Sequence, residues 1–74
     1  MPSERTLPRH TQIADRLRAD IQSGIYGLGA RLPIEAELDT LLNTRRPTLR
    51  QSLATLSAEV LIERRPRTGS VVGA

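Results

Sequence analysis

The sequence predicts a small, mostly α-helical domain that closes with a β-hairpin, and three observations support this. Apolar residues recur at spacings of three and four in three separate segments, as they do on one face of a helix. Glycine or proline lies next to each of these segments. Finally, residues 61–72 contain two short β-prone runs around a Pro-Arg-Thr-Gly turn. A length of 74 residues corresponds to one domain.

The first helix is predicted at residues 9–23. Ile13, Leu17 and Ile21 are four residues apart and therefore share one face. Gly24 follows the last of them and suits the left-handed conformation that ends many helices.

The segments on either side of this helix are predicted to be irregular. Residues 1–8 are polar and contain two prolines, so we expect a flexible arm in front of a folded domain at 9–74. Residues 24–33 contain three glycines and a proline, which predicts a turn with at most a short strand near residues 31–32.

The second helix is predicted at residues 34–42. Its apolar face consists of Leu38, Leu41 and Leu42. Glu35 and Glu37 fall in its first turn, where the helix dipole stabilises negative charge.

The third helix is predicted at residues 45–59, with Thr44 as its N-cap and Pro47 in its first turn. Its apolar positions, spaced by four, three and four, are Leu49, Leu53, Leu56 and Val60. The turn before it is three or four residues long, as in a helix-turn-helix, and the hairpin that follows makes the fold a winged one.

Arginine supplies all the basic charge, since the chain has 11 arginines and no lysine against eight acids. Residues 9–42 hold four arginines and five acids, whereas residues 43–74 hold six arginines and two acids. The net charge of +3 therefore concentrates in the second half, which favours an anionic partner such as nucleic acid. A solvated surface, or an organism rich in G and C, would account for the same arginine content.

Composition excludes several classes of function. Without cysteine there is no disulfide framework, thiolate metal site or cysteine nucleophile. The single histidine, His10, is interpreted as a surface residue, so we expect no metal, no cofactor and no enzyme. The longest apolar run is three residues, far below the ~20 that a transmembrane helix needs, and a bacterial-type cytoplasm is the expected location.

Four segments, in order, carry a resemblance to a known family. They are QIADRLRADIQSGIY (12–26), G-A-R-L-P-x-E-x-E-L (29–38), R-x-T-L-R-Q-S-L (46–53) and LIERRPRTGSVV (61–72). With these motifs the chain resembles the N-terminal DNA-binding domain of the GntR family of bacterial transcriptional regulators. The first segment looks most like the HutC-type branch.

The resemblance implies a winged helix-turn-helix that belongs to a transcriptional regulator. We expect this regulator to be a repressor. The helix at 45–59 would enter the major groove of double-stranded DNA, and the wing at 62–72 would lie at the backbone or minor groove. A homodimer would bind a palindromic operator, on DNA or through a C-terminal effector domain. Whether the chain is an excised domain or a complete short protein is left open.

The same resemblance assigns residues of the third helix to DNA. The arginine, threonine and second arginine of the family motif match Arg46, Thr48 and Arg50. Arginine can contact G O6 and N7 with both arms, and threonine suits a phosphate or the thymine methyl group. Arg45 is a charge without a family counterpart, and we expect it to contact a phosphate.

The wing supplies the remaining candidates. The family's wing glycine matches Gly69, and Arg67 stands where a second glycine is usual. Arg64 and Arg65 point to opposite faces of the strand, so only one of them is expected to face DNA. We assign Arg65 and Arg67, at the tip, to contacts with DNA.

Other positions depart from the family pattern. Val60 replaces a glycine, and a β-branched residue there would strain a left-handed helix ending. Ile34 replaces a capping serine, and Ala36 replaces an arginine that contacts DNA in many members. Thr44 and Arg45 replace the usual Val-Ser pair.

Two further expectations concern the arginines outside the family motif and an alternative function. Arg16, Arg18 and Arg31 are expected to be solvated or paired with Asp15, Asp20 or Glu35. A winged helix can also serve as a protein-interaction module without sequence-specific DNA binding, although such a face should expose apolar or aromatic anchors.

Overall fold

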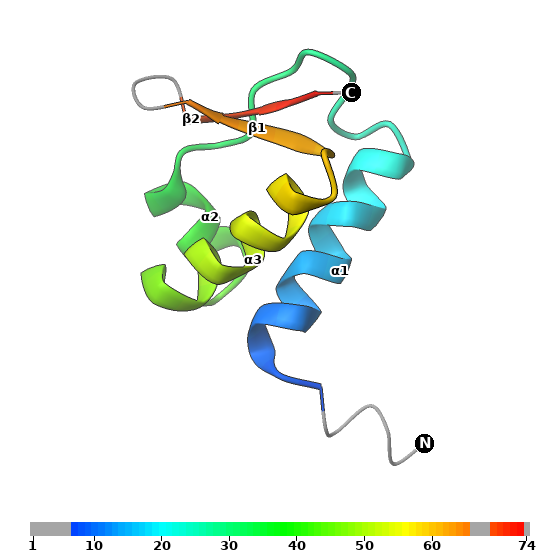
Figure 1. Cartoon of the computed structure of the whole chain (residues 1–74). Coiled ribbons are helices and arrows are strands. Elements are labelled where there is room, and N and C mark those ends of the chain that lie inside the picture. Colours follow the sequence, from blue (N-terminus) through cyan, green and yellow to red (C-terminus); the bar gives the residue numbers. More distant parts are fainter. Residues whose placement is uncertain (1–6, 66–68, 74) are drawn as a thin grey trace.

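The computed structural model describes residues 7–65 and 69–73, which form three helices followed by a two-stranded antiparallel sheet (Figure 1). The elements are α1 (Arg9–Gln22), α2 (Glu35–Leu41), α3 (Arg46–Ala58), β1 (Ile62–Arg65) and β2 (Gly69–Val72). This confirms the predicted fold class, and each helix boundary lies within one residue of its predicted position. The arm predicted at residues 1–8 falls mostly outside the described residues and stays a prediction.

The core forms where α1 and α2 pack against α3 and the hairpin covers one end of the helices (Figure 1). Its buried hydrophobic residues are Ile13, Ala14, Leu17, Leu32, Leu38, Leu49, Leu53, Leu56, Ile62 and Val72. The chain has one tyrosine and no phenylalanine or tryptophan, so the core is aliphatic. Burying one leucine side chain stabilises a fold by about 1.5–3 kcal/mol. Ser52, fully buried on α3, donates its hydroxyl to the carbonyl oxygen of His10 on α1 at 2.7 Å.

Two predicted core positions are wrong. Leu41 is 66% exposed and Val60 is 64% exposed. Leu41 is the last residue of α2, a helix of seven residues, and only Leu38 of that helix is buried. Val60 lies beyond the end of α3, where the chain leaves the helical path.

All three helices end in the same way, with one residue in the left-handed conformation. These residues are Gly24 after α1 (φ +90°), Asn43 after α2 (φ +52°) and Val60 after α3 (φ +63°). In each case the next amide donates to the carbonyl five residues earlier, at 2.9–3.1 Å, which is the Schellman motif. The strain predicted at Val60 is therefore present, since only glycine takes this conformation without a steric cost.

The start of α3 corrects one prediction. Thr44 is not the N-cap; Arg45 holds that position in an extended conformation, and no side chain caps the helix. The hydroxyl of Thr44 is buried without a hydrogen-bond partner among the described residues. Asn43 has a left-handed conformation, and α3 begins three residues after it at Arg46. Four residues, 42–45, therefore join α2 to α3.

The wing has more support than its two strands provide. In register, Ile62 is opposite Val72 and Arg65 is opposite Gly69. On the other side of β2, Arg31 forms an isolated bridge with Val71, at the place where at most a short strand was predicted. Backbone hydrogen bonds of 2.7–2.9 Å join this segment to Ser70 and Val72. The base of the wing is therefore fixed to the loop that leads into α2.

Arginines of α1 tie the helices together. Arg9 donates from Nη2 to the carbonyl oxygens of Leu42 (2.7 Å) and Asn43 (3.2 Å), just after α2. Arg18 pairs with Glu59 beyond α3 (2.8 Å) and with Asp15 (2.6 Å). The hydrogen bond to Glu59 raises the pKa of Arg18 most, and the hydrogen bond to Asp15 raises it further. Within residues 7–65 and 69–73, no helix has the length and hydrophobicity needed to cross a bilayer.

Candidate nucleic-acid interface

The outward face of α3 is polar and small. Leu49 and Leu53 are buried on one side of the helix, while Pro47, Gln51 and Ala54 are exposed on the other. Arg50 lies beside them with 62% of its side chain exposed. No large side chain follows Gln51 on this outward face, so the helix can approach another surface closely.

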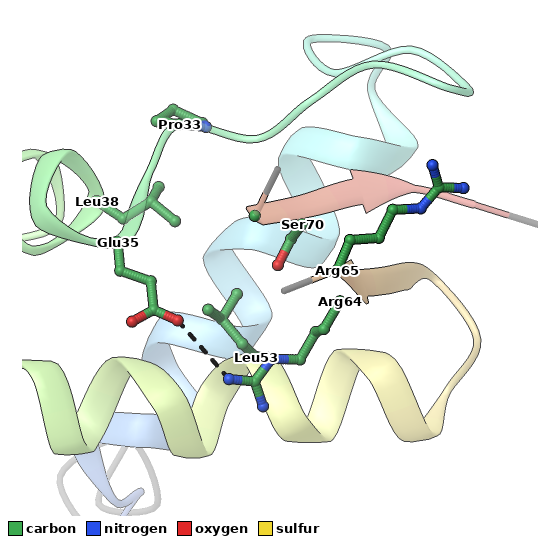
Figure 2. Close-up of a pocket in the computed structure, with 8 residues that line it drawn as sticks. Pro33, Glu35, Leu38, Leu53, Arg64, Arg65 and Ser70 are labelled. Atoms are coloured by element: carbon green, nitrogen blue, oxygen red, sulfur yellow. Dashed lines mark ion pairs between the residues drawn. The ribbon is translucent and has the colours of Figure 1, made fainter. Parts of the chain in front are cut away.

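Three arginines from two elements converge on the carboxylate of Glu35. Arg50 on α3 brings Nε to 3.4 Å from Oε1, and Arg46 brings Nη1 to 3.8 Å from the same oxygen. From β1, Arg64 brings Nη2 to 3.7 Å from Oε2 (Figure 2). Glu35 is the first residue of α2, so one carboxylate links α2, the start of α3 and the wing. We call these four residues the Glu35 cluster.

Asp39, one turn further along α2, holds Arg46 more tightly. Its Oδ2 accepts a hydrogen bond from Nε of Arg46 at 2.9 Å. Asp39 is 20% exposed and Glu35 is 30% exposed, so both acids are better shielded from water than the arginines they contact. Three guanidinium groups thus face two carboxylates, which leaves an excess of one positive charge.

A hollow of about 380 Å³ lies at one place between the helices and the wing (Figure 2). Glu35, Arg64 and Arg65 lie around it, with the buried Leu38 and Leu53 on the helix side. Arg64 reaches toward Glu35, whereas Arg65 extends the other way from the strand (Figure 2). The two arginines therefore project from opposite faces of β1, as the alternation predicted.

The other predicted site residues are spread around this cluster. Arg45 is exposed at the N-cap of α3, and Thr48 is half-buried behind it. Arg65 is exposed and pairs with Glu63 at 3.0 Å. Gly69, opposite Arg65, has φ +82°, a conformation that glycine adopts without a steric cost. Arg67 lies outside the described residues.

Sequence reasoning missed the acidic part of the site. Glu35 was considered as a partner of Arg16, Arg18 or Arg31, but it pairs with arginines of α3 and β1. Arg16 pairs with Asp20 at 3.4 Å and Arg18 with Asp15, as expected. A signal for Asp39 was present, because it lies four residues after Glu35 and thus on the same face of a helix that precedes a basic one.

The chemistry available here is recognition of an anion. Guanidinium groups bind phosphates and guanine edges through paired N–H groups. The described residues contain no group of three His, Cys, Asp or Glu side chains that could hold a metal ion. The basic surface around the start of α3 and the wing is the candidate site.

Comparison with known proteins identifies relatives over nearly the whole chain. The family model described as "Bacterial regulatory proteins, gntR family" matches residues 9–72. The Uxu operon regulator of Haemophilus influenzae is 33% identical over 63 residues, which cover 85% of this chain and 24% of that protein. The Mannosyl-D-glycerate transport/metabolism system repressor MngR of Escherichia coli is 37% identical over 65 residues, covering 88% of this chain and 27% of that protein.

The fold has close structural neighbours as well. The DNA-binding domain of AraR, solved in complex with the operator ORX1, superimposes with a TM-score of 0.89. The match covers 95% of this chain and 84% of that one, at 24% sequence identity. Three helices and a hairpin wing are thus shared. The chain spans about a quarter of the length of the curated relatives, and the HutC-type branch stays a prediction.

Proposed function

The chain belongs to the GntR family of bacterial regulatory proteins, and we propose on this basis that it binds double-stranded operator DNA sequence-specifically. The observation that carries the proposal is the position of Arg50. It is 62% exposed, near the start of a helix with a small outward face, beside a wing with two further arginines. An α-helix of this kind fits the major groove, where an arginine can contact both O6 and N7 of guanine.

We assign the predicted residues to two kinds of contact. Arg46 and Arg50 contact base edges, and Thr48 contacts a phosphate or a thymine methyl group. Arg45, at the N-cap, contacts a phosphate, where the N-terminal amides of α3 also favour negative charge.

The wing binds the backbone or the minor groove. Arg65 and Arg67 contribute charge there without reading bases, since a long cation gains from counterion release whatever sequence lies beneath it. Gly69, with its positive φ, allows the turn to close next to the DNA.

The proposal extends to the assembly and the biological role. Two copies bind the two halves of a palindromic operator as a homodimer, because a two-fold site matches a two-fold protein. The protein represses transcription in the bacterial cytoplasm, as the description of MngR as a repressor supports. It binds DNA and catalyses no reaction.

Selection from random double-stranded DNA tests the function directly. The 74-residue chain is incubated with the pool at two concentrations, and bound duplexes are sequenced after several rounds. We expect one enriched half-site at the lower concentration and paired, inverted half-sites at the higher one. The affinity for the enriched duplex should fall steeply as salt rises.

Two outcomes would contradict the proposal. A pool that stays random through the selection would show that the chain lacks sequence preference. Binding that ignores salt would point to the alternative, a winged-helix module that docks on another protein.

A further inference from the structure

We propose that Glu35 is a positioning residue that sets the sequence specificity of this interface, although it is an acid facing an acidic partner. Its carboxylate holds the guanidinium of Arg50 and ties the wing to α3 through Arg64. The inference rests on the proposed function and adds a residue that the family motif on α3 and the wing did not assign to DNA.

The first argument is geometric. Each of α2, α3 and β1 contributes to the Glu35 cluster, and the 3.4 to 3.8 Å contacts centre on a single carboxylate. Glu35 is 30% exposed, and it is held at the first residue of α2, just after the proline-containing lead-in. A fixed carboxylate between mobile cations restricts their rotamers before any ligand arrives.

The second argument concerns which nitrogen is engaged. Glu35 contacts Arg50 through Nε, and Asp39 contacts Arg46 through Nε. The two terminal nitrogens of Arg50 make no hydrogen bond within residues 7–65 and 69–73. Those two nitrogens form the fork that binds O6 and N7 of guanine end-on. The carboxylate therefore orients the fork and leaves it free.

The third argument is the sign of the charge. A carboxylate near a phosphate backbone opposes binding to every DNA sequence equally. Orientation of Arg50, in contrast, favours only duplexes with guanine at the right position. Loss of the Glu35 charge should thus strengthen non-specific binding while it weakens discrimination, a combination that damage to the fold would not produce.

Glu37 provides a matched control. It lies in the same first turn of α2, so its neutralisation changes the net charge and the helix-dipole interaction in the same way. It is exposed and forms no ion pair with the residues that the structure describes. Any difference in DNA binding between Glu35→Gln and Glu37→Gln therefore reflects the position of the lost carboxylate and not the change in net charge.

The experiment compares three proteins on two duplexes. Wild type, Glu35→Gln and Glu37→Gln are titrated against the half-site selected above and against a scrambled duplex of the same composition, at one salt concentration. In Glu35→Gln we expect the ratio of the two affinities to fall about ten-fold, within the range of one bidentate base contact. Affinity for the scrambled duplex should rise, and Glu37→Gln should keep the wild-type ratio.

A second measurement is independent of DNA. The ¹H–¹⁵N resonance of the Arg50 Nε–H group is followed in the three free proteins. Glu35→Gln should shift it and speed its exchange with water, because the ionic acceptor is gone; Glu37→Gln should leave it unchanged.

The outcomes separate the two proposals. If wild type itself binds both duplexes equally, the proposed function fails. If wild type discriminates but the two variants behave alike, or the Arg50 resonance is unaffected, Glu35 has no positioning role. Equal gains by Glu35→Gln on both duplexes would reduce Glu35 to a repulsive charge and overturn the inference.

Discussion

Arginine side chains in this chain differ in what their guanidinium groups already contact. Arg18 is 26% exposed and lies between Glu59 and Asp15, whose hydrogen bonds raise its pKa. Both of its ionic contacts are 2.8 Å or shorter. Arg50 is 62% exposed and has one longer contact through Nε. Arg18 thus ties α1 to the end of α3, whereas the terminal nitrogens of Arg50 make no hydrogen bond with the described residues.

This difference predicts the effect of Arg50→Ala. Binding to the selected duplex should weaken by about 1–3 kcal/mol, with relaxed preference at one base pair, because the variant loses a bidentate base contact. Titrations against the selected duplex and its single-base variants measure both quantities.

Arg16→Ala is the control for that experiment. Arg16 lies on α1, is 66% exposed and pairs only with Asp20 among the described residues, so its removal changes the net charge equally. It should leave base preference intact. A uniform loss of affinity for all duplexes in Arg50→Ala would assign Arg50 to a phosphate and contradict the base-reading role.

Among the secondary-structure elements, the three helix endings form a natural comparison. The same hydrogen-bonded motif carries glycine after α1, asparagine after α2 and valine after α3. Asparagine tolerates the left-handed region, and valine, branched at Cβ, does so poorly. The hydrogen bonds and the buried Leu56, three residues before Glu59, keep the α3 ending in place despite this cost.

Val60→Gly should therefore stabilise the domain. Glycine removes the steric cost of the left-handed conformation, and this gain outweighs the added flexibility of the unfolded chain. The free energy of unfolding should therefore rise by about 1 kcal/mol. For a domain of this size that gain raises Tm by about 4–8 °C. Little burial is lost, because Val60 is 64% exposed. Thermal unfolding followed by circular dichroism measures the change.

Asn43→Gly is the matched variant for the α2 ending. Its gain should be clearly smaller than that of Val60→Gly, since asparagine already tolerates positive φ. Equal shifts for both variants, or a lower Tm for Val60→Gly, would show that the valine carries no backbone strain.

Local patterns predicted the elements well and their ends less well. Periodicity placed the three helices, and the glycine expected after α3 correctly marked Val60 as a strained position. Thr44 was wrong as a cap because α3 begins one residue later than predicted, with Arg45 at the N-cap and no side chain capping the helix. Leu41 was wrong as a core residue because α2 has only seven residues and buries one of them.

In the whole molecule, the basic residues of the candidate site could be proposed from the sequence, whereas the acid that they contact could not. The family motif singled out Arg46, Arg50 and Gly69, and their contacts with DNA stay a prediction. The contact between Glu35 and Arg64 joins residues far apart in the chain, and it exists only because the wing folds back over α2 and α3. Charge counts along the sequence could not pair these residues.

The surface of the molecule predicts a monomer in isolation. A stable dimer buries about 800 Å² on each partner, mainly through a contiguous apolar centre. Among residues 7–65 and 69–73, the exposed large hydrophobic residues come instead from separate segments: Leu7, Ile25, Leu28, Ile34, Leu41 and Val60. Sedimentation of the 74-residue chain at micromolar concentration should give the mass of one copy. A stable dimer in the absence of DNA would refute this.

The support behind the wing also governs how copies of the protein meet each other. An unpaired strand edge invites another chain to extend the sheet, which is how many aggregates begin. Here β2 is covered on both sides, by β1 and by the segment around Arg31. Of the two outer edges, the one on the Arg31 side comes from an isolated bridge, and the one on β1 carries Glu63, Arg64 and Arg65 in succession. Copies crowded along DNA thus face one another with a short, charged edge that disfavours intermolecular strand pairing.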